Sequence, residues 1–207
     1  MSSSLKRAPT KKQFRLFKAF VFLLCLVPFL RLFFLALQDD LSANPVEFLE
    51  RATGFWTLFI LLLTLSLTPI RLLTGIAWPI QLRRMTGLFM YFYACLHITT
   101  YVWLDHSFFW PDISHDILKH PYVLVGFSAF LFTTTLAITS NNFMIRKLGR
   151  RWKQLHRLVY LIGILGVVHF WWLVKKDIRE PLLYGCILFV LLAIRIYSSS
   201  IGPKRTG

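Results

Sequence analysis

The sequence has little charge for its length, and acidic residues are especially scarce. Only 16% of its 207 residues are charged and nine are acidic, whereas 56% are hydrophobic. A soluble domain of this size does not carry several apolar runs that each reach the roughly 20 residues needed to cross a bilayer. The composition therefore excludes an ordinary soluble protein and predicts an integral membrane protein.

Further absences exclude other classes of protein. The formal net charge is +15, but the basic residues lie at the ends of apolar runs rather than on one domain, which argues against nucleic-acid binding. Three cysteines, Cys25, Cys95 and Cys186, lie within apolar runs at unrelated spacings, which is typical of packing residues rather than of a disulfide or metal site. The sequence has no GxGxxG motif and no strand pattern, so the chain cannot oxidise a nicotinamide by itself in the usual way.

The apolar runs predict an all-α integral membrane protein with a bundle of six transmembrane helices. The first run is too long for a signal peptide and lacks a small-residue cleavage site. The expected spans are residues 14–37, 55–73, 85–104, 122–140, 153–174 and 181–199. Residues 1–13 then form a basic leader, residues 14–199 one six-helix domain, and residues 200–207 a short basic tail.

The distribution of charge predicts the orientation of these spans. The leader, the second and fourth connections, the tail and the span ends that adjoin them hold 18 of the 24 Lys and Arg residues, while all nine Asp and Glu residues fall in the other three connections. Lys and Arg mark cytoplasmic loops, so we expect both termini in the cytoplasm. For a bacterial source, this predicts a multi-pass protein of the inner membrane.

Three histidines, His97, His156 and His169, fall within the predicted spans, where ionisable groups are costly and are functional candidates by default. His97 lies seven residues before position 104 and His169 five before position 174, so their depths agree to within about 3 Å. Two neutral imidazoles at one depth on different helices suit the axial positions of a haem, whereas zinc or copper would require more ligands. The alternative is that each histidine hydrogen-bonds a neighbouring helix.

His156 raises a geometric problem within the fifth span. It lies near the cytoplasmic start of that span, roughly 20 Å from His169 along a helix axis. On a straight helix the two side chains would point about 140° apart. Local rewinding near Gly163 and Gly166, or two cofactors reached from different sides, would reconcile the two positions.

Four arginines are candidates for contacts with the propionates of a haem or the phosphate of a flavin, because guanidinium binds such anions well. Arg83, Arg84 and Arg151 lie near the predicted level of His156, and Arg31 lies near that of the outer histidines. The alternative for the first three is orientation of the chain and contact with lipid headgroups. The alternative for Arg31 is that its side chain extends to the membrane surface.

The connection over residues 105–121 is the longest between the predicted helices. Its candidate metal ligands are Asp105, His106, Asp112, His115, Asp116 and His120. Their spacing matches no known ligand pattern, so we expect a solvated loop rather than a metal site, with acidic charge that can steer a partner. Trp171 and Trp172 either line an exit path for electrons or anchor the chain at the membrane surface.

Several motifs together carry a resemblance to a known family. They are RRMTGL (83–88), LHITTY (96–101), HPYVLVG (120–126), ITS (138–140), RKLGRRWKQLHRLVYL (146–161) and the later His169. Over about residues 28–197 the sequence resembles the MsrQ (YedZ) family, the haem-binding membrane subunit of the bacterial periplasmic methionine sulfoxide reductase system. It is similar, more broadly, to the transmembrane domains of ferric reductases and NADPH oxidases.

The resemblance implies an electron-transfer subunit with no sulfoxide-reducing site of its own. Electrons would come from membrane quinol or a cytosolic flavin reductase, pass through one or two b-type haems, and reach a periplasmic molybdenum-cofactor enzyme that reduces methionine sulfoxide in proteins. FMN is also associated with the family. His97 and His169 would ligate the outer haem and His156 the inner one.

One departure from the wider superfamily concerns the inner haem. The oxidases carry a second histidine on the third helix, fourteen residues before the outer one, and Arg83 occupies that position here. An inner haem on His156 would therefore need another ligand or be five-coordinate.

Two other functions remain compatible with the sequence. The chain could be a ferric reductase-like or b561-like protein that reduces a small acceptor directly. It could also be a transporter or scaffold whose histidines join helices by hydrogen bonds, although it shows no paired half-repeats of the kind common in transporters.

Overall fold

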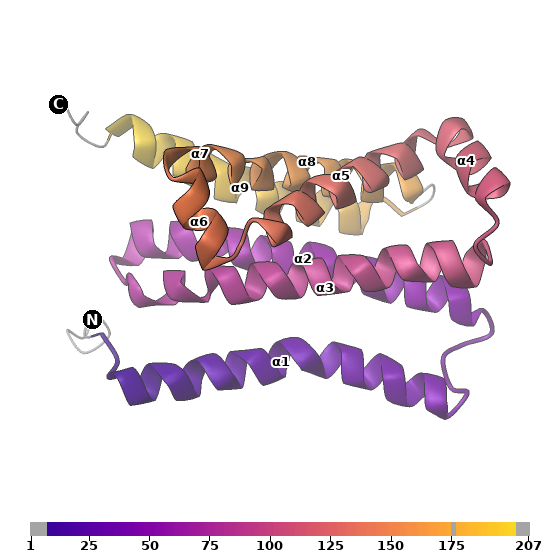
Figure 1. The fold of residues 1–207 in the computed structure, drawn as a ribbon, viewed down its shortest axis with the longest axis horizontal. Coiled ribbons are helices and arrows are strands. Elements are labelled where there is room, and N and C mark those ends of the chain that lie inside the picture. The colour runs from indigo at the N-terminus through magenta and orange to yellow at the C-terminus, as the bar shows by residue number, and fades with distance from the viewer. Residues whose placement is uncertain (1–7, 175–176, 202–207) are drawn as a thin grey trace.

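The structure is a computed structural model that describes residues 8–174 and 177–201. Six helical segments are long and apolar enough to cross a membrane. They are Lys11–Leu37, Pro45–Thr74, Trp78–Asp105, Pro121–Ile138, Arg150–Leu173 and Arg179–Ser198. Every regular element within the described residues is helical, which confirms the predicted all-α bundle of six spans (Figure 1). Most of the predicted leader and tail, together with Lys175 and Lys176, lies outside the described residues.

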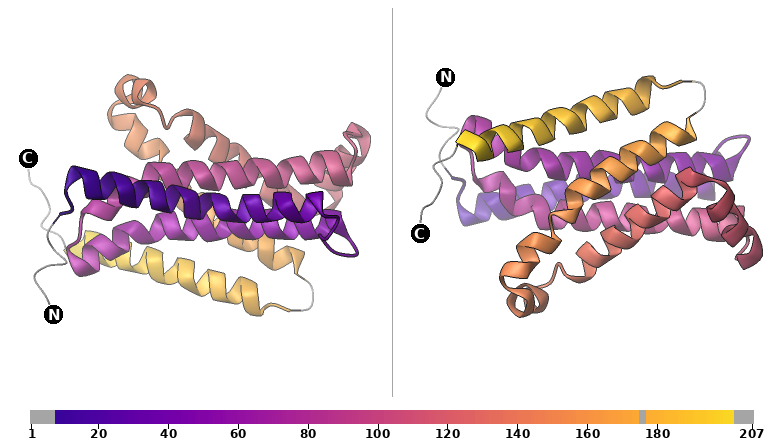
Figure 2. Two further views of the ribbon diagram at one scale, coloured as in Figure 1. Left: turned by 90° about the horizontal axis from the view of Figure 1, so that it is seen from below. Right: turned by 90° about the horizontal axis from the view of Figure 1, so that it is seen from above.

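The helices form three layers. The long ones are α1 (Lys11–Leu37), α2 (Pro45–Thr74), α3 (Arg83–Thr99), α5 (Pro121–Ile138), α8 (Leu158–Leu173) and α9 (Arg179–Ile201). α2 and α3 occupy the middle, with α1 on one side and α5, α8 and α9 on the other (Figure 1). α5 and α8 pair with each other and run obliquely to α2 and α3 (Figure 2). The start of α1 and the end of α9 lie at the same end of the bundle, as an even number of spans requires (Figure 1).

α1 bends near its middle, where Pro28 interrupts the helix (Figure 1). A proline inside a helix removes one backbone hydrogen bond and forces neighbouring carbonyls apart. The hydroxyl of Tyr93 on α3 enters this gap: it accepts from the Phe29 N–H at 3.0 Å and donates to the Cys25 carbonyl at 2.8 Å. Tyr93 is completely buried, so its hydroxyl ties the bend of α1 to the central layer.

α2 begins ten residues earlier than the expected span at 55–73, so the start predicted for this span is wrong. Local sequence explains the early start. The Asn44 side chain caps the helix by accepting from the Glu47 N–H, and Pro45 occupies the first turn, where its missing N–H has no consequence. Arg51 then pairs with Glu47 one turn later at 2.8 Å.

The third span is longer than the expected 85–104 and changes its winding at both ends. The 3-10 helix η2 (Trp78–Leu82) precedes α3, and the π-helix η3 (Thr100–Asp105) follows it.

The outer connection is not simply a solvated loop, because it contains the amphipathic helix α4 (Trp110–Lys119), which buries Ile113. The fourth and sixth spans differ from the predicted bounds by about two residues at their ends.

The fifth span is not one straight helix. Two short helices, α6 (Asn142–Leu148) and α7 (Arg150–Leu155), lead into α8. The helix is interrupted by a turn at His156 and Arg157, between α7 and α8. The angle of about 140°, which holds only for a straight helix, therefore does not apply to His156 and His169. The break lies at His156 itself, whereas Gly163 and Gly166 both lie within regular α8.

The core lies where α2, α3 and α8 meet. Its most deeply buried members include Ile60, Leu61, Leu65, Met90, Tyr93 and Ile162. Large apolar side chains elsewhere point outward, such as Leu73 at 71% exposed and Phe189 at 72%. An exposed apolar surface of this extent fits contact with lipid.

Candidate functional site

The fold brings His97 and His169 together from different layers of the bundle. His97 lies on α3 and His169 on α8, 72 residues apart in sequence, yet their ring centroids are 6.3 Å apart and their planes are inclined by 78°. The equal depth inferred from the sequence thus corresponds to direct proximity. Neither ring contacts His156, whose aromatic neighbour is Trp152.

This separation fits one metal atom between two imidazoles. Metal–imidazole bonds are about 2 Å long and each ring centre lies roughly 1 Å behind its nitrogen, so the two centres should be about 6 Å apart. Within the described residues, no cluster of three or more His, Cys, Asp or Glu side chains could hold a metal ion. The pair therefore offers two imidazole donors, a number that a haem iron can take from the protein.

Each imidazole is oriented by a backbone carbonyl on a neighbouring helix. His97 Nδ1 lies 3.1 Å from the Glu50 carbonyl of α2 and 3.3 Å from Thr53 Oγ1. His169 Nδ1 lies 2.7 Å from the Tyr122 carbonyl of α5. A carbonyl can only accept, so Nδ1 carries the proton in both rings and Nε2 keeps its lone pair. This is the arrangement that metal-binding histidines use to fix their tautomer.

His156 is held differently. Its Nε2 lies 3.2 Å from Thr139 Oγ1, and its ring stacks on Trp152 with a centroid distance of 4.0 Å. The Trp152 indole N–H donates to the Thr139 carbonyl at 2.9 Å, which ties α7 to the end of α5. No second histidine lies beside His156 in the described residues, so a cofactor there would find one imidazole whose Nε2 is already hydrogen-bonded.

The structure separates the four arginines that sequence reasoning grouped as anion contacts. Arg83 lies close enough to His156 and Arg195 for their charges to interact. Arg84 donates to Asn142 Oδ1 at 2.8 Å and so links α3 to α6. Arg31 and Arg151 are exposed, and neither forms an ion pair or hydrogen bond with the residues that the structure describes.

An arginine that sequence reasoning passed over lies inside the last span. Arg195 on α9 donates to the Tyr160 hydroxyl and, at 3.2 Å, to the Leu65 carbonyl. Its guanidinium carbon also lies 5.1 Å from the centroid of the Tyr160 ring. The position of Arg195 in the sequence could have identified it, since a charged residue within an apolar span is a functional candidate.

The outer connection gathers polar side chains around Asp116. The Tyr101 hydroxyl donates to Asp116 Oδ2 at 2.8 Å, His120 Nδ1 lies 2.6 Å from Oδ1, and His106 Nε2 lies 3.8 Å from Oδ2. Burial alone would raise the pKa of the Asp116 carboxyl, but the hydrogen bonds from Tyr101 and His120 outweigh it and hold the pKa below its usual value. Asp112 and His115 are exposed on α4 and take no part in this group.

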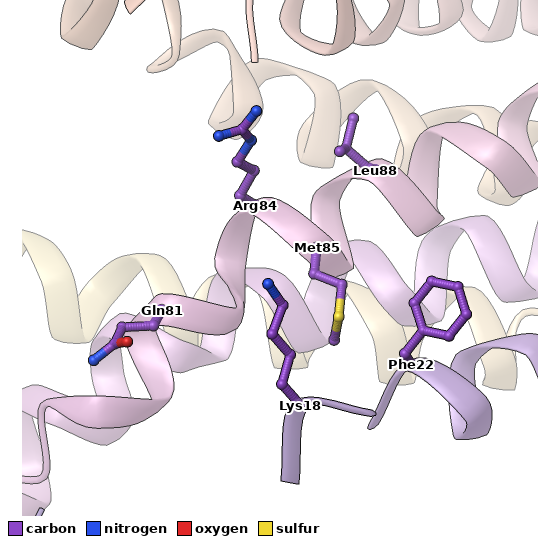
Figure 3. Close-up of a pocket in the computed structure, with 6 residues that line it drawn as sticks. All are labelled: Lys18, Phe22, Gln81, Arg84, Met85 and Leu88. Atoms are coloured by element: carbon purple, nitrogen blue, oxygen red, sulfur yellow. The ribbon is translucent and has the colours of Figure 1, made fainter. Parts of the chain in front are cut away.

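Two shallow recesses open on the surface of the bundle. One is lined by Pro121, Tyr122 and the half-exposed Trp172. The other lies between α1 and the start of α3, where Lys18, Gln81 and Arg84 lie around Phe22, Met85 and Leu88 (Figure 3). His97 and His169 are both partly exposed, and the first recess lies beside His169 because the Tyr122 carbonyl contacts His169 Nδ1.

Comparisons with known proteins agree with one another. A family described as ferric reductase like transmembrane component matches residues 51–167. The protein-methionine-sulfoxide reductase heme-binding subunit MsrQ of Herminiimonas arsenicoxydans is 48% identical over 192 residues, which cover 91% of this chain and 88% of that protein. The subunit of the same name from Xanthomonas campestris pv. campestris (strain B100) is 53% identical over 169 residues, covering 82% and 77%. The one from Bordetella pertussis is 48% identical over 181 residues, covering 86% and 88%. No solved structure matches the chain.

Proposed function

The chain belongs to the family of MsrQ heme-binding subunits, within the ferric reductase like transmembrane proteins, and we propose that it binds haem b and transfers electrons across the membrane. The observation that carries this proposal is the His97–His169 pair, whose ring centroids are 6.3 Å apart. In this proposal the two Nε2 atoms would hold the iron of an outer haem. The curated relatives are named for heme binding, which supports the same cofactor here.

Backbone groups beside the pair would prepare it for this role. The Glu50 and Tyr122 carbonyls hold the two Nδ1–H groups, which leaves Nε2 unprotonated and raises its basicity. At membrane depth, apolar helices and lipid would keep bulk water from the pair. A bound haem would supply one-electron redox chemistry that none of the side chains at this depth offers.

We further propose a route for the electrons. This proposal is based on the name of the relatives and on the resemblance in sequence. Electrons from membrane quinol or a cytosolic flavin reductase would reach a periplasmic molybdenum-cofactor enzyme that reduces methionine sulfoxide in proteins. The chain itself would have no sulfoxide-reducing site. A second haem on His156, bound FMN, and anion contacts from Arg83, Arg84, Arg31 and Arg151 belong to the same proposal.

The proposed location is the bacterial inner membrane with both termini in the cytoplasm. The excess of Lys and Arg in the second and fourth connections supports this orientation, as does the placement of all nine acidic residues in the other three. The outer group around Asp116 would then face the periplasm, on the side of the proposed partner.

A direct reductase of a small acceptor is the second candidate, favoured by the match to the ferric reductase like family over residues 51–167. The two functions differ in their electron acceptor. Pre-reduced protein should be oxidised by the separate methionine sulfoxide reductase subunit if the first function holds. Rapid oxidation by ferric chelates with none by that subunit would favour the second.

Absorption spectra test the haem proposal directly. The dithionite-reduced protein in detergent should show the α-band of b-type haem, and the haem-to-protein ratio decides between one and two haems. His97→Ala and His169→Ala should each lose most of the outer haem, whereas His115→Ala, on the exposed face of α4, should keep it. A colourless wild-type protein would refute the proposal and favour a transporter or scaffold. Full haem content in both ligand variants would refute the assignment of the ligands.

A further inference from the structure

The two histidines of the pair share a local arrangement that neither the family match nor the haem proposal requires. His97 binds the carbonyl of Glu50 on α2, and His169 binds the carbonyl of Tyr122 on α5. In both helices the residue four positions after that carbonyl is a glycine, Gly54 in α2 and Gly126 in α5. The same acceptor-and-glycine spacing thus occurs twice, on unrelated stretches of sequence.

The glycines lie directly against the rings. A Cβ on Gly54 would lie 3.2 Å from His97 Cε1 and 3.4 Å from its Nδ1. A Cβ on Gly126 would lie 2.7 Å from His169 Nδ1 and 2.8 Å from its Cε1. Non-bonded carbon atoms are most stable at about 3.5–4.0 Å, so an added methyl group would be slightly too close at Gly54 and far too close at Gly126.

Helix geometry explains why the spacing is four. Residues i and i+4 lie above one another on the same face of an α-helix, and the carbonyl of residue i points toward residue i+4. An imidazole that donates to this carbonyl from a neighbouring helix must therefore lie over position i+4. Only glycine leaves that space open, because it has no Cβ.

We propose that Gly54 and Gly126 are positioning residues that keep both imidazoles donating from Nδ1 and presenting Nε2 to the cofactor. Their action is indirect, since neither glycine offers a ligand. A side chain at either position pushes the ring away from its carbonyl and weakens the Nδ1–H hydrogen bond. The ligand nitrogen then loses basicity, which stabilises ferric haem less and raises the midpoint potential.

The two positions differ in a way that ranks the expected effects. His169 has a single carbonyl acceptor at 2.7 Å, and Gly126 makes the closer contact. His97 can share its proton between the Glu50 carbonyl and Thr53 Oγ1, and Gly54 has a few tenths of an ångström more room. Gly126→Ala should therefore have a larger effect than Gly54→Ala.

Gly87 provides a matched control. It also lies inside a membrane-spanning helix, α3, but a Cβ there would meet nothing within 4 Å. Gly87→Ala should leave the haem unchanged. Thr53→Val, which removes one acceptor with almost no change in volume, should raise the midpoint potential less than Gly54→Ala.

The experiment is a spectroscopic redox titration of the full-length protein and these four variants in detergent, with haem content measured in parallel. We expect higher midpoint potentials in Gly54→Ala and Gly126→Ala and about 10- to 100-fold weaker haem retention in the latter, with Gly87→Ala equal to wild type. Nitrogen-15 NMR of histidine-labelled protein, freed of any haem, gives a second readout that needs no cofactor. Wild-type His97 and His169 should be protonated at Nδ1, and Gly126→Ala should populate the other tautomer of His169.

The outcomes separate this inference from the haem proposal on which its redox readout rests. A wild-type protein that binds no haem would refute the proposed function, and the NMR measurement would still test the glycines. If wild type binds haem but both glycine variants match Gly87→Ala in potential, haem retention and tautomer, the inference is refuted. If Gly126→Ala does not fold, Gly54→Ala and Thr53→Val carry the same test on the His97 side.

Discussion

At the scale of single residues, Arg195 is a cation inside the last span that has no acidic partner among residues 8–174 and 177–201. No Asp or Glu follows Glu180 in the sequence, and the guanidinium instead donates to the Tyr160 hydroxyl and the Leu65 carbonyl. Hydrogen bonds to charged groups are stronger than neutral ones, so these two contacts offset part of the cost of placing the charge there. They also join α9 to α8 and α2 across the upper two layers of the bundle.

Tyr160→Phe should therefore destabilise the protein by about 1.5–3 kcal/mol, because it leaves a charged N–H without its acceptor. Thermal unfolding in detergent, followed by circular dichroism, measures the effect. Tyr197→Phe is the control, since Tyr197 is 70% exposed on the same helix as Arg195. In an Arg195→Gln background Tyr160→Phe should have little effect, and an undiminished loss there would show that the hydroxyl acts on something else.

Asp116 gives a prediction about pH. Its hydrogen bonds from Tyr101 and His120 hold the carboxyl pKa below the ordinary value of 3.8, so the folded state favours the ionised form. That stabilisation is complete above the ordinary pKa and is lost as the pH falls through the lower, folded-state value. Asp116→Asn should lower the melting temperature at pH 7, and the difference from wild type should shrink at pH values below 3.8. Asp112→Asn, at an exposed position of the same helix, should show neither effect.

At the scale of elements, α1 depends on Tyr93 to complete its bend. Tyr93→Phe leaves the Phe29 N–H and the Cys25 carbonyl without their shared partner, which should cost about 1–3 kcal/mol. Pro28→Ala in the Tyr93→Phe background should recover part of this loss, because a helix without proline can close its own hydrogen bonds. Thermal unfolding of the two variants measures both effects. Equal stability of wild type and Tyr93→Phe would show that the bend does not need the hydroxyl.

The elements also show how far the sequence predicts the fold. All six spans follow from apolar length, since every backbone polar group at membrane depth must be bonded within its own helix. The break at His156 has no such local mark, because neither proline nor glycine occurs at residues 155–158. The contacts of Trp152 with the Thr139 carbonyl and the His156 ring accompany the break, and contacts between distant segments have no periodic pattern in the sequence.

The candidate site was likewise predictable only in part from the sequence. Depth could be counted from the sequence, because helices rise by a constant amount per residue, and this led to the pairing of His97 with His169. The acceptors of their protons could not be found in this way, since every residue has a carbonyl and the sequence does not mark which one is used. What accompanies both acceptors in the sequence is a glycine four residues later, Gly54 after Glu50 and Gly126 after Tyr122.

At the scale of the whole molecule, the two ends of the bundle differ in charge. The group around Asp116 and the acidic start of α2 lie at the end where α1 finishes and α2 begins. Arg83, Arg84 and the basic residues of α6 and α7 lie at the other end (Figure 1). The histidine pair lies nearer the acidic end, since His97 binds Glu50 in the second turn of α2. A haem held by this pair would therefore be closer to an acceptor that docks at the acidic end.

This asymmetry makes the orientation in the membrane testable. Alkaline phosphatase, which is active only outside the cytoplasm, should be active when fused within residues 105–120 and inactive when fused within residues 141–149. A green fluorescent protein fusion should give the opposite pattern, because it does not become fluorescent after export in an unfolded state. Replacing Arg146, Lys147, Arg150 and Arg151 by Gln should weaken the preference and give partial phosphatase activity at the second site, since positive charge near span ends sets the orientation. The reverse pattern in the unchanged chain would place the His97–His169 pair near the cytoplasm, and a periplasmic acceptor could then not be the partner of this site.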